Sequence, residues 1–243
     1  MIFALLPASL IGLSLGLLGS GGSIITLPVM VYIAGIPVSQ AVGMSLVVVG
    51  GTSAVGSFLR FRQGEFAGRA AILFTVSEMI GAFYGAKLTH LVESKTLMLL
   101  FGGLMLIVGA ALLRKRAVTA EPKSCHLVQC LAVGALVGVM TGFLGVGGGF
   151  LILPALVLFA GLEMKTAIDT SLAIISLNSA AGVVGQLRYV SLNWMETLIF
   201  LAVAVLGMFG GQLLAKRLSS QSLQRGFAWA IIVLGLFLLA KNR

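Results

Sequence analysis

The stretch GLLGSGG at residues 16–22 recurs as GFLGVGG at residues 142–148, 126 residues further along the chain. A proline follows six residues after each copy, at Pro28 and at Pro154. Both copies interrupt long apolar runs, and runs of this length indicate helices, because the strands of a membrane barrel show about ten-residue alternation instead. The chain therefore has two broken apolar helices at corresponding places in its two halves, which is the best pointer in a sequence to the substrate site of a transporter.

The composition places the chain in a lipid bilayer. Hydrophobic residues make up 59% of it and charged residues only 9%, whereas a soluble domain carries about 25% charged residues. So few charges cannot cover a surface that faces water, and we expect an all-α, polytopic integral membrane protein. Residues 1–12 contain no Lys or Arg and so lack the basic start of a cleaved signal peptide, which predicts that they begin a retained membrane segment.

The net charge of +9 comes from basic residues in short loops between apolar segments. This distribution is typical of the positive-inside rule, and we expect no nucleic-acid partner. A path for anions would also favour positive potential, so a second role for these charges stays open.

Hydropathy predicts eight apolar segments, of which the first and the fifth are broken. In the first half they cover residues 2–34 (broken near 19–23), 37–59, 69–91 and 95–113, and in the second half 126–160 (broken near 145–149), 163–187, 194–214 and 223–240. A polar stretch separates the halves. We therefore expect a first repeat at residues 1–117, a linker at 118–125 and a second repeat at 126–243.

The two halves align without a gap when the chain is shifted by 126 residues. Matching apolar residues would mean little in so biased a chain, but glycine, serine and arginine also match in fixed register. The matched pairs include Ser45 with Ser171, Arg62 with Arg188, Gly81 with Gly207, Gly85 with Gly211 and Gly109 with Gly235. This register predicts an internal duplication of four segments.

The orientation of the repeats depends on whether the broken segments cross the membrane. Four full crossings per half would make the repeats parallel. The piece at residues 24–34 has only eleven residues, however, and a helical span needs about 20. If the broken segments enter the membrane and return, each half crosses three times and the repeats are inverted. We expect the inverted arrangement, although the distribution of Lys and Arg over the loops does not separate the two models.

Each glycine cluster predicts an anion site. A break at membrane depth leaves unpaired N–H groups at the start of the next half-helix, and these groups together with the helix dipole attract anions. Glycine also lets the backbone approach a ligand closely. A phosphate-binding loop is not indicated, since no Gly-Lys-Ser/Thr follows. Close helix packing through glycine is the structural alternative.

The predicted substrate-binding residues lie in the two glycine clusters and in the segments that follow them. Serine and threonine in membrane helices usually bond neighbouring helices, but Ser45 and Ser171 match across the repeats. The full predicted set is Gly19, Ser20, Gly21, Gly22, Ser23, Ser45, Gly145, Gly147, Gly148, Gly149, Thr170 and Ser171.

Ionisable residues inside a membrane are functional candidates by default. Glu78 and Asp169 fall within apolar segments, and either is predicted to carry a coupling proton. The structural alternatives are that Asp169 lies near the interface and that Glu78 pairs with a basic residue such as Lys87. Arg62 and Arg188 end matching segments, where they either anchor the helices or recruit an anion.

Metal and cofactor binding are not predicted. Cys125 and Cys130 flank His126, but this set is too small for a closed zinc site, which needs four ligands. We expect no metal and no cofactor.

The paired motifs resemble those of the TauE/SafE (sulfite exporter-like) family of membrane transporters. They stand here as GLLGSGGSIITLPVMVYIAG with AVGMSL, and as GFLGVGGGFLILPALVLFAG with AIDTSL. The resemblance covers essentially the whole chain. It implies a multi-pass secondary transporter of the bacterial cytoplasmic (inner) membrane, with sulfite, sulfonates, other sulfur-containing anions or carboxylates as substrates.

Residues and resemblance together predict a transporter that binds a small anion at the glycine breaks near the midplane and exposes it alternately to each side. A proton or sodium ion is the expected coupling partner, and the sequence leaves the oligomeric state open. Two alternatives stay open: an intramembrane enzyme, which would need a convergent nucleophile or metal set, and a non-transporting subunit of a larger membrane complex.

Overall fold

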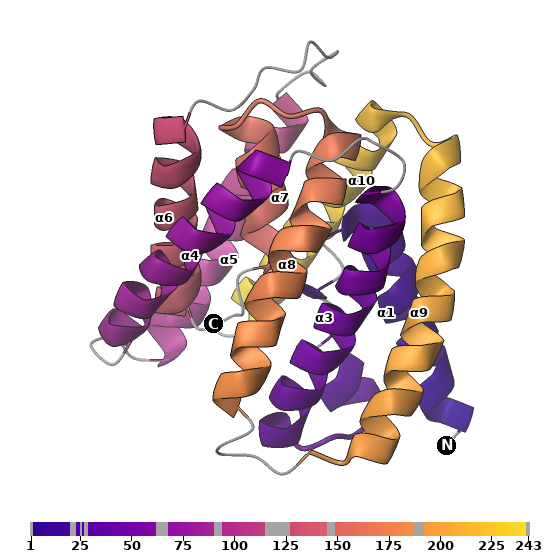
Figure 1. The fold of residues 1–243 in the computed structure, drawn as a ribbon. Helices are drawn as coiled ribbons and strands as arrows, with labels where there is room; N and C mark the ends of the chain where they lie inside the picture. The colour runs from indigo at the N-terminus through magenta and orange to yellow at the C-terminus, as the bar shows by residue number, and fades with distance from the viewer. Residues whose placement is uncertain are drawn as a thin grey trace. The chain divides into compact units, whose positions relative to one another are not determined.

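The computed structural model describes residues 2–19, 23–24, 26, 29–61, 68–89, 94–114, 127–144, 149–186 and 192–241 (Figure 1). Within these ranges every element is a helix. The first half contains α1 (Ile2–Leu18), a π-helical turn η2 (Val29–Ile33), α3 (Val38–Phe61), α4 (Gly68–Thr89) and α5 (Ser94–Arg114). The second half contains α6 (Leu127–Leu144), α7 (Gly149–Leu158), α8 (Met164–Gln186), α9 (Trp194–Arg217) and α10 (Ser220–Lys241). The predicted all-α class is confirmed.

Four helices of the described ranges are long and apolar enough to cross a membrane. These stretches are Gln40–Arg60, Met164–Val184, Trp194–Arg217 and Ser220–Ala240. Large apolar side chains such as Phe83, Leu206 and Val233 are more than half exposed. Exposure of this kind on long helices fits contact with lipid.

Both predicted breaks coincide with helix ends. Helix α1 ends at Leu18 and the next residue, Gly19, has a φ of +60°. Helix α6 ends at Leu144 and α7 begins at Gly149. Helix α7 has 10 residues, all buried from Gly149 to Val157, so it is about 15 Å long and too short to cross a hydrocarbon core of about 30 Å.

The chain forms two compact units, and each combines helices from both halves of the sequence. Unit 1 contains residues 1–71 and 168–218, and unit 2 contains residues 72–167 and 219–243.

In unit 1, α1 and α9 lie side by side (Figure 1). A Cβ on Gly12 would lie 1.8 Å from the carbonyl oxygen of Ala204, and one on Gly16 would lie 2.2 Å from that of Met208. The contacting residue numbers rise together, so the two helices run parallel. Their backbones touch because glycine leaves no side chain between them.

Helix α3 of unit 1 runs parallel to α9 and antiparallel to α8. A Cβ on Gly56 would lie 3.0 Å from the sulfur of Met208 and 3.2 Å from Leu172 Cδ1, whereas one on Gly182 would lie 3.2 Å from Leu46. The contacts therefore place the C-terminal part of α3 beside the N-terminal part of α8.

In unit 2, α4 packs on α6 in the same close way (Figure 1). A Cβ on Gly138 would lie 2.1 Å from the carbonyl oxygen of Glu78, and one on Gly142 would lie 2.2 Å from that of Ala82. Each of these four residues stands 126 positions from its counterpart in the α1–α9 contact of unit 1.

Helices α5 and α10 of unit 2 are antiparallel neighbours. A Cβ on Gly109 would lie 3.2 Å from the carbonyl oxygen of Ala228, and one on Gly235 would lie 3.1 Å from that of Gly102. The Nε2 of Gln224 donates a 2.7 Å hydrogen bond to the carbonyl of Leu112, which ties the start of α10 to the end of α5.

Candidate functional site

The end of α1 lies directly against α8. A Cβ on Gly19 would come within 2.9 Å of Ser171 Oγ and 3.0 Å of Ile168 Cγ2. Gly19 is buried, and its positive φ is a conformation that L side chains rarely adopt. The Ser171 hydroxyl donates a 2.8 Å hydrogen bond to the Ile168 carbonyl. The structure thus brings together two predicted site residues, Gly19 and Ser171, that are far apart in sequence.

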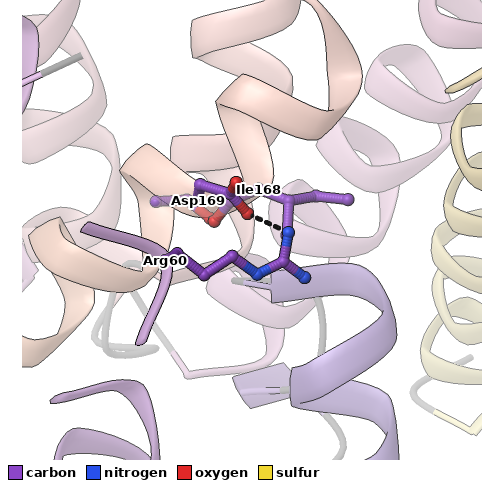
Figure 2. A network of polar contacts seen from close by, with 4 residues as sticks. Arg60, Ile168 and Asp169 are labelled. Atoms are coloured by element: carbon purple, nitrogen blue, oxygen red, sulfur yellow. Dashed lines mark hydrogen bonds and ion pairs between the residues drawn. The ribbon is translucent and has the colours of Figure 1, made fainter. Parts of the chain in front are cut away.

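An ion pair is buried beside this contact. Nη1 of Arg60, in the last turn of α3, lies 2.5 Å from Oδ1 of Asp169 on α8 (Figure 2). Arg60 is 8% exposed and Asp169 is 1% exposed. Removing two charges from water is costly, and a buried pair compensates for it only when hydrogen bonds satisfy the remaining donors and acceptors.

Several buried polar atoms of α3, α8 and α9, the pair's own Arg60 Nη2 among them, lack hydrogen-bond partners in the described part of the chain. They are Arg60 Nη2, Thr170 Oγ1, Ser53 Oγ and Gln212 Nε2. A buried donor left unsatisfied costs about 1–3 kcal/mol, so native structures have few of them and each needs an explanation.

These groups come from three helices that meet at the end of α1. Ser53, Gly56 and Arg60 stand at helical spacing on α3, and a Cβ on Gly56 would lie 3.3 Å from Gln212 Nε2 and 3.2 Å from Leu172 Cδ1. Leu172 follows Asp169 by one helical turn. We call Ser53, Arg60, Asp169, Thr170 and Gln212 the polar cluster.

The polar cluster lies closer to the C-terminal end of α9 than to its middle. A Cβ on Gly211 would lie 2.9 Å from the backbone nitrogen of Leu17, so the end of α1 is level with this part of α9. Helix α9 continues only to Arg217, about 9 Å further. Lys216 and Arg217 are exposed there, so two positive charges lie at this end of α9.

Ser45 does not join this cluster. Its hydroxyl donates a 2.8 Å hydrogen bond to the Val42 carbonyl. Ser45 precedes Gly56 by 11 residues on α3, or about 16 Å along the helix, and Gly56 is the residue that contacts Leu172.

The other predicted binding residues are distributed as follows. Ser23 is half-buried, Thr170 is fully buried, and Gly149 is buried as the first residue of α7. Six further predictions lie outside the described residues: Ser20, Gly21, Gly22, Gly145, Gly147 and Gly148.

Of the predicted ionisable residues, Glu78 lies in α4 and is 2% exposed. Asp169 pairs with Arg60, a partner that the sequence did not predict. Arg62, Arg188, Cys125 and His126 lie outside the described residues. Within the described ranges, no group of three or more His, Cys, Asp or Glu side chains is placed to hold a metal ion.

Arg60 and Gln212 are functional candidates that sequence reasoning misses. Arg60 stands close to Arg62 at a segment end and so reads as a loop residue, yet it belongs to the apolar helix stretch Gln40–Arg60. Gln212 stands in an otherwise apolar run of α9. For Gln212 the available signal was a strongly polar side chain within the predicted segment 194–214, whereas Arg60 lies just beyond the predicted segment 37–59.

The fold and this site define a multi-pass helical membrane protein whose first helix is interrupted beside a buried charged cluster, an arrangement typical of membrane transporters. The chain belongs to the Sulfite exporter TauE/SafE family, whose model matches residues 4–238. The resemblance expected from the motifs is confirmed.

Curated relatives agree with this assignment. The chain is 33% identical to a "Probable membrane transporter protein" of Xylella fastidiosa, covering 100% of this chain and 96% of the relative. It is 28% identical to a protein of the same description from Methanocaldococcus jannaschii, covering 97% and 96%. It is 24% identical to the "Probable membrane transporter protein YdhB" of Bacillus subtilis, covering 85% and 86%. No solved structure matches.

Proposed function

We propose that this protein is a secondary transporter for a small oxyanion in a bacterial cytoplasmic membrane. The substrate class is sulfite, a sulfonate, or another sulfur-containing or carboxylate anion. Family membership supports the transport activity. The description of the family as sulfite exporters supports a sulfur oxyanion as the substrate.

The contact between Gly19 and Ser171 is the observation that carries this proposal. It brings the start of the first glycine cluster to the turn of α8 that contains Asp169, Thr170 and Ser171. In the proposal, backbone N–H groups of Ser20 to Ser23 and the hydroxyls of Thr170 and Ser171 donate hydrogen bonds to the oxyanion. Backbone donors at a helix start favour negative charge without requiring a basic side chain.

The second glycine cluster belongs to the same proposal. Gly145, Gly147, Gly148 and Gly149 are the sequence counterparts of the first cluster, and Ser45 is the counterpart of Ser171. Val146 replaces Ser20, so the two copies differ in their hydroxyl donors.

We also propose that residues 1–117 and 126–243 are inverted repeats. Two observations support it. Helices α5 and α10 are sequence counterparts and antiparallel neighbours in unit 2, and α3 and α8 have the same relation in unit 1. A two-fold axis perpendicular to the helices produces this relation, as in transporters with inverted repeats. Rocking of packed elements about a fixed site would then expose the anion to each side in turn.

A coupling proton or sodium ion completes the proposed cycle, and Glu78 and Asp169 are its candidate carriers. Both are buried in helices, and buried carboxyl groups in membrane proteins often serve as proton relays.

Flux of sulfite, sulfoacetate and acetate into liposomes containing the purified chain tests the proposal. We expect saturable flux that Gly21→Val and Gly147→Val each reduce strongly, because a valine side chain fills the space of the anion. Gly210→Val is the matched control, since nothing lies within 4 Å of a Cβ at this position. Normal flux with both glycines substituted would refute the glycine site, and absence of flux from the chain alone would favour a subunit role.

A further inference from the structure

We propose that Arg60 binds the charge of the transported anion and that Asp169 competes with the anion for the same guanidinium. This inference rests on the proposed function and names the side chains that act in it. In the empty carrier Asp169 occupies Nη1 of Arg60. The anion binds at Nη2 with help from Thr170 and Gln212, so it shares the charge of the guanidinium with Asp169.

The guanidinium of Arg60 is only partly used. Its Nη1 meets Asp169, while its Nη2 is buried and has no hydrogen-bond partner in the described part of the chain. A guanidinium presents five N–H donors in a rigid fork, which suits two oxygens of one anion. The open side of the fork therefore matches an oxyanion in both charge and shape.

The neighbouring buried groups select the same class of ligand. Thr170 Oγ1 and Gln212 Nε2 also lack partners among the described residues, and both can donate. A cation would be repelled by Arg60, and an apolar guest would leave all of these donors unsatisfied. An acceptor with negative charge satisfies them together.

The duplication argues that the pair is not needed to build the fold. The counterparts of Arg60 and Asp169, 126 residues away, are Gln186 on α8 and Gly43 on α3, so the repeat-related positions of the same two helices carry no ion pair. The close glycine contacts, by contrast, occur at both sets of repeat-related positions, one set in each unit. The ion pair therefore stands at only one of two repeat-related places along α3 and α8, and it predicts one charged anion site per chain.

Competition between Asp169 and the anion has a measurable consequence. Loss of the carboxylate in Asp169→Asn frees the guanidinium, so the anion should bind more tightly. A hydrogen bond to a charged group contributes about 1.5–3 kcal/mol, which corresponds to roughly 10-fold to 150-fold in affinity. We expect Asp169→Asn to tighten binding by about tenfold or more.

The decisive variant is the double substitution Arg60→Gln with Asp169→Asn. Arg60→Gln alone leaves a buried unpaired carboxylate and is prone to misfold, whereas the double variant removes both charges at once. We expect the double variant to elute from a size-exclusion column as the wild-type protein does. Its affinity for sulfite and sulfoacetate should be lower by about 10-fold or more, and Arg60→Lys should bind weakly, because an ammonium cannot reproduce the fork.

The test measures the binding of sulfite and sulfoacetate in detergent by calorimetry, and their flux in liposomes. Together the two measurements distinguish failure of this inference from failure of the proposed function. A folded double variant that binds and transports like the wild type would overturn the role of Arg60 and leave the proposed function standing. Loss of binding in an Asp169→Asn protein that elutes from the size-exclusion column as the wild type does would overturn the competition, because Asp169 would then hold Arg60 in place for the anion. A wild-type protein without binding or flux for any anion tested would overturn the proposed function and this inference with it.

Discussion

Gly19 lies against the side chain of Ser171, so close that a Cβ on Gly19 would come within 2.9 Å of the serine hydroxyl oxygen. Gly19 directly follows the last residue of α1, and Ser171 stands in the turn of α8 that also contains Asp169 and Thr170. Their contact joins the interrupted helix to the buried polar cluster and gives the proposed anion site a defined place in unit 1.

Gly19→Ala should impair transport more than its loss of stability explains. The positive φ of Gly19 costs an alanine about 1–2 kcal/mol, and the new methyl group would also displace Ser171. Gly35→Ala is the matched control, because Gly35 has a φ of +69° with nothing within 4 Å of a Cβ. Thermal unfolding and anion flux should be measured on both variants. Equal flux in the two would show that the Ser171 contact has no role in transport.

Gly211→Ala should destabilise the protein, whereas Gly210→Ala should not. A Cβ on Gly211 would lie 2.3 Å from the backbone carbonyl oxygen of Leu13, and Gly210 has nothing within 4 Å. Backbone cannot move aside without separating α1 from α9. In Gly210→Ala, alanine favours the helix over glycine by roughly 0.5–1 kcal/mol. Melting temperatures in detergent test this pair, and equal values would contradict the close packing of α1 on α9.

Arg60→Gln should be far less stable than the double variant with Asp169→Asn. Removing one partner of a buried pair costs about 3–5 kcal/mol, because the other charge stays buried without compensation. Removing both charges avoids that penalty. Unfolding of the wild type, both single variants and the double variant forms a complete cycle. Additive effects of the two single substitutions would mean that the two side chains do not interact.

Gln212→Leu and Gln224→Leu should differ in their effects on stability and on anion affinity. Gln212 Nε2 has no hydrogen-bond partner among the described residues, so leucine removes an unsatisfied donor and should leave stability unchanged or improved. Gln224 bonds the Leu112 carbonyl, and its loss should cost about 1–3 kcal/mol. Anion affinity should fall only in Gln212→Leu. A loss of stability without loss of affinity in Gln212→Leu would remove Gln212 from the site.

Much of the fold could be predicted from the sequence because lipid imposes simple rules on length and composition. The predicted segment at residues 194–214 corresponds to α9 at Trp194–Arg217, and the break near 145–149 falls between Leu144 and Gly149. A positive φ at Gly35 and at Gly161 follows the same register of 126 residues. Glycine permits these conformations at little cost, so glycines that repeat at this spacing indicate directly where the backbone adopts a positive φ.

The candidate site was harder to predict because its members come from different helices. Nothing in the sequence indicates that Arg60 faces Asp169 or that Gln212 lies beside Gly56, since those contacts depend on how helices pack. The match of Ser45 with Ser171 at a spacing of 126 residues predicts a duplication. It could not say that the two serines would lie about 16 Å apart along the helices.

The most direct test of the anion site is the location of a heavy oxyanion in a crystal of the native protein. Selenite has the charge and shape of sulfite, and the anomalous signal of selenium marks its position. The account predicts one strong peak per chain, within hydrogen-bonding distance of Arg60 Nη2 and beside Thr170 and Gly19. Peaks only at exposed residues such as Lys216 and Arg217, with none beside Arg60, would contradict it.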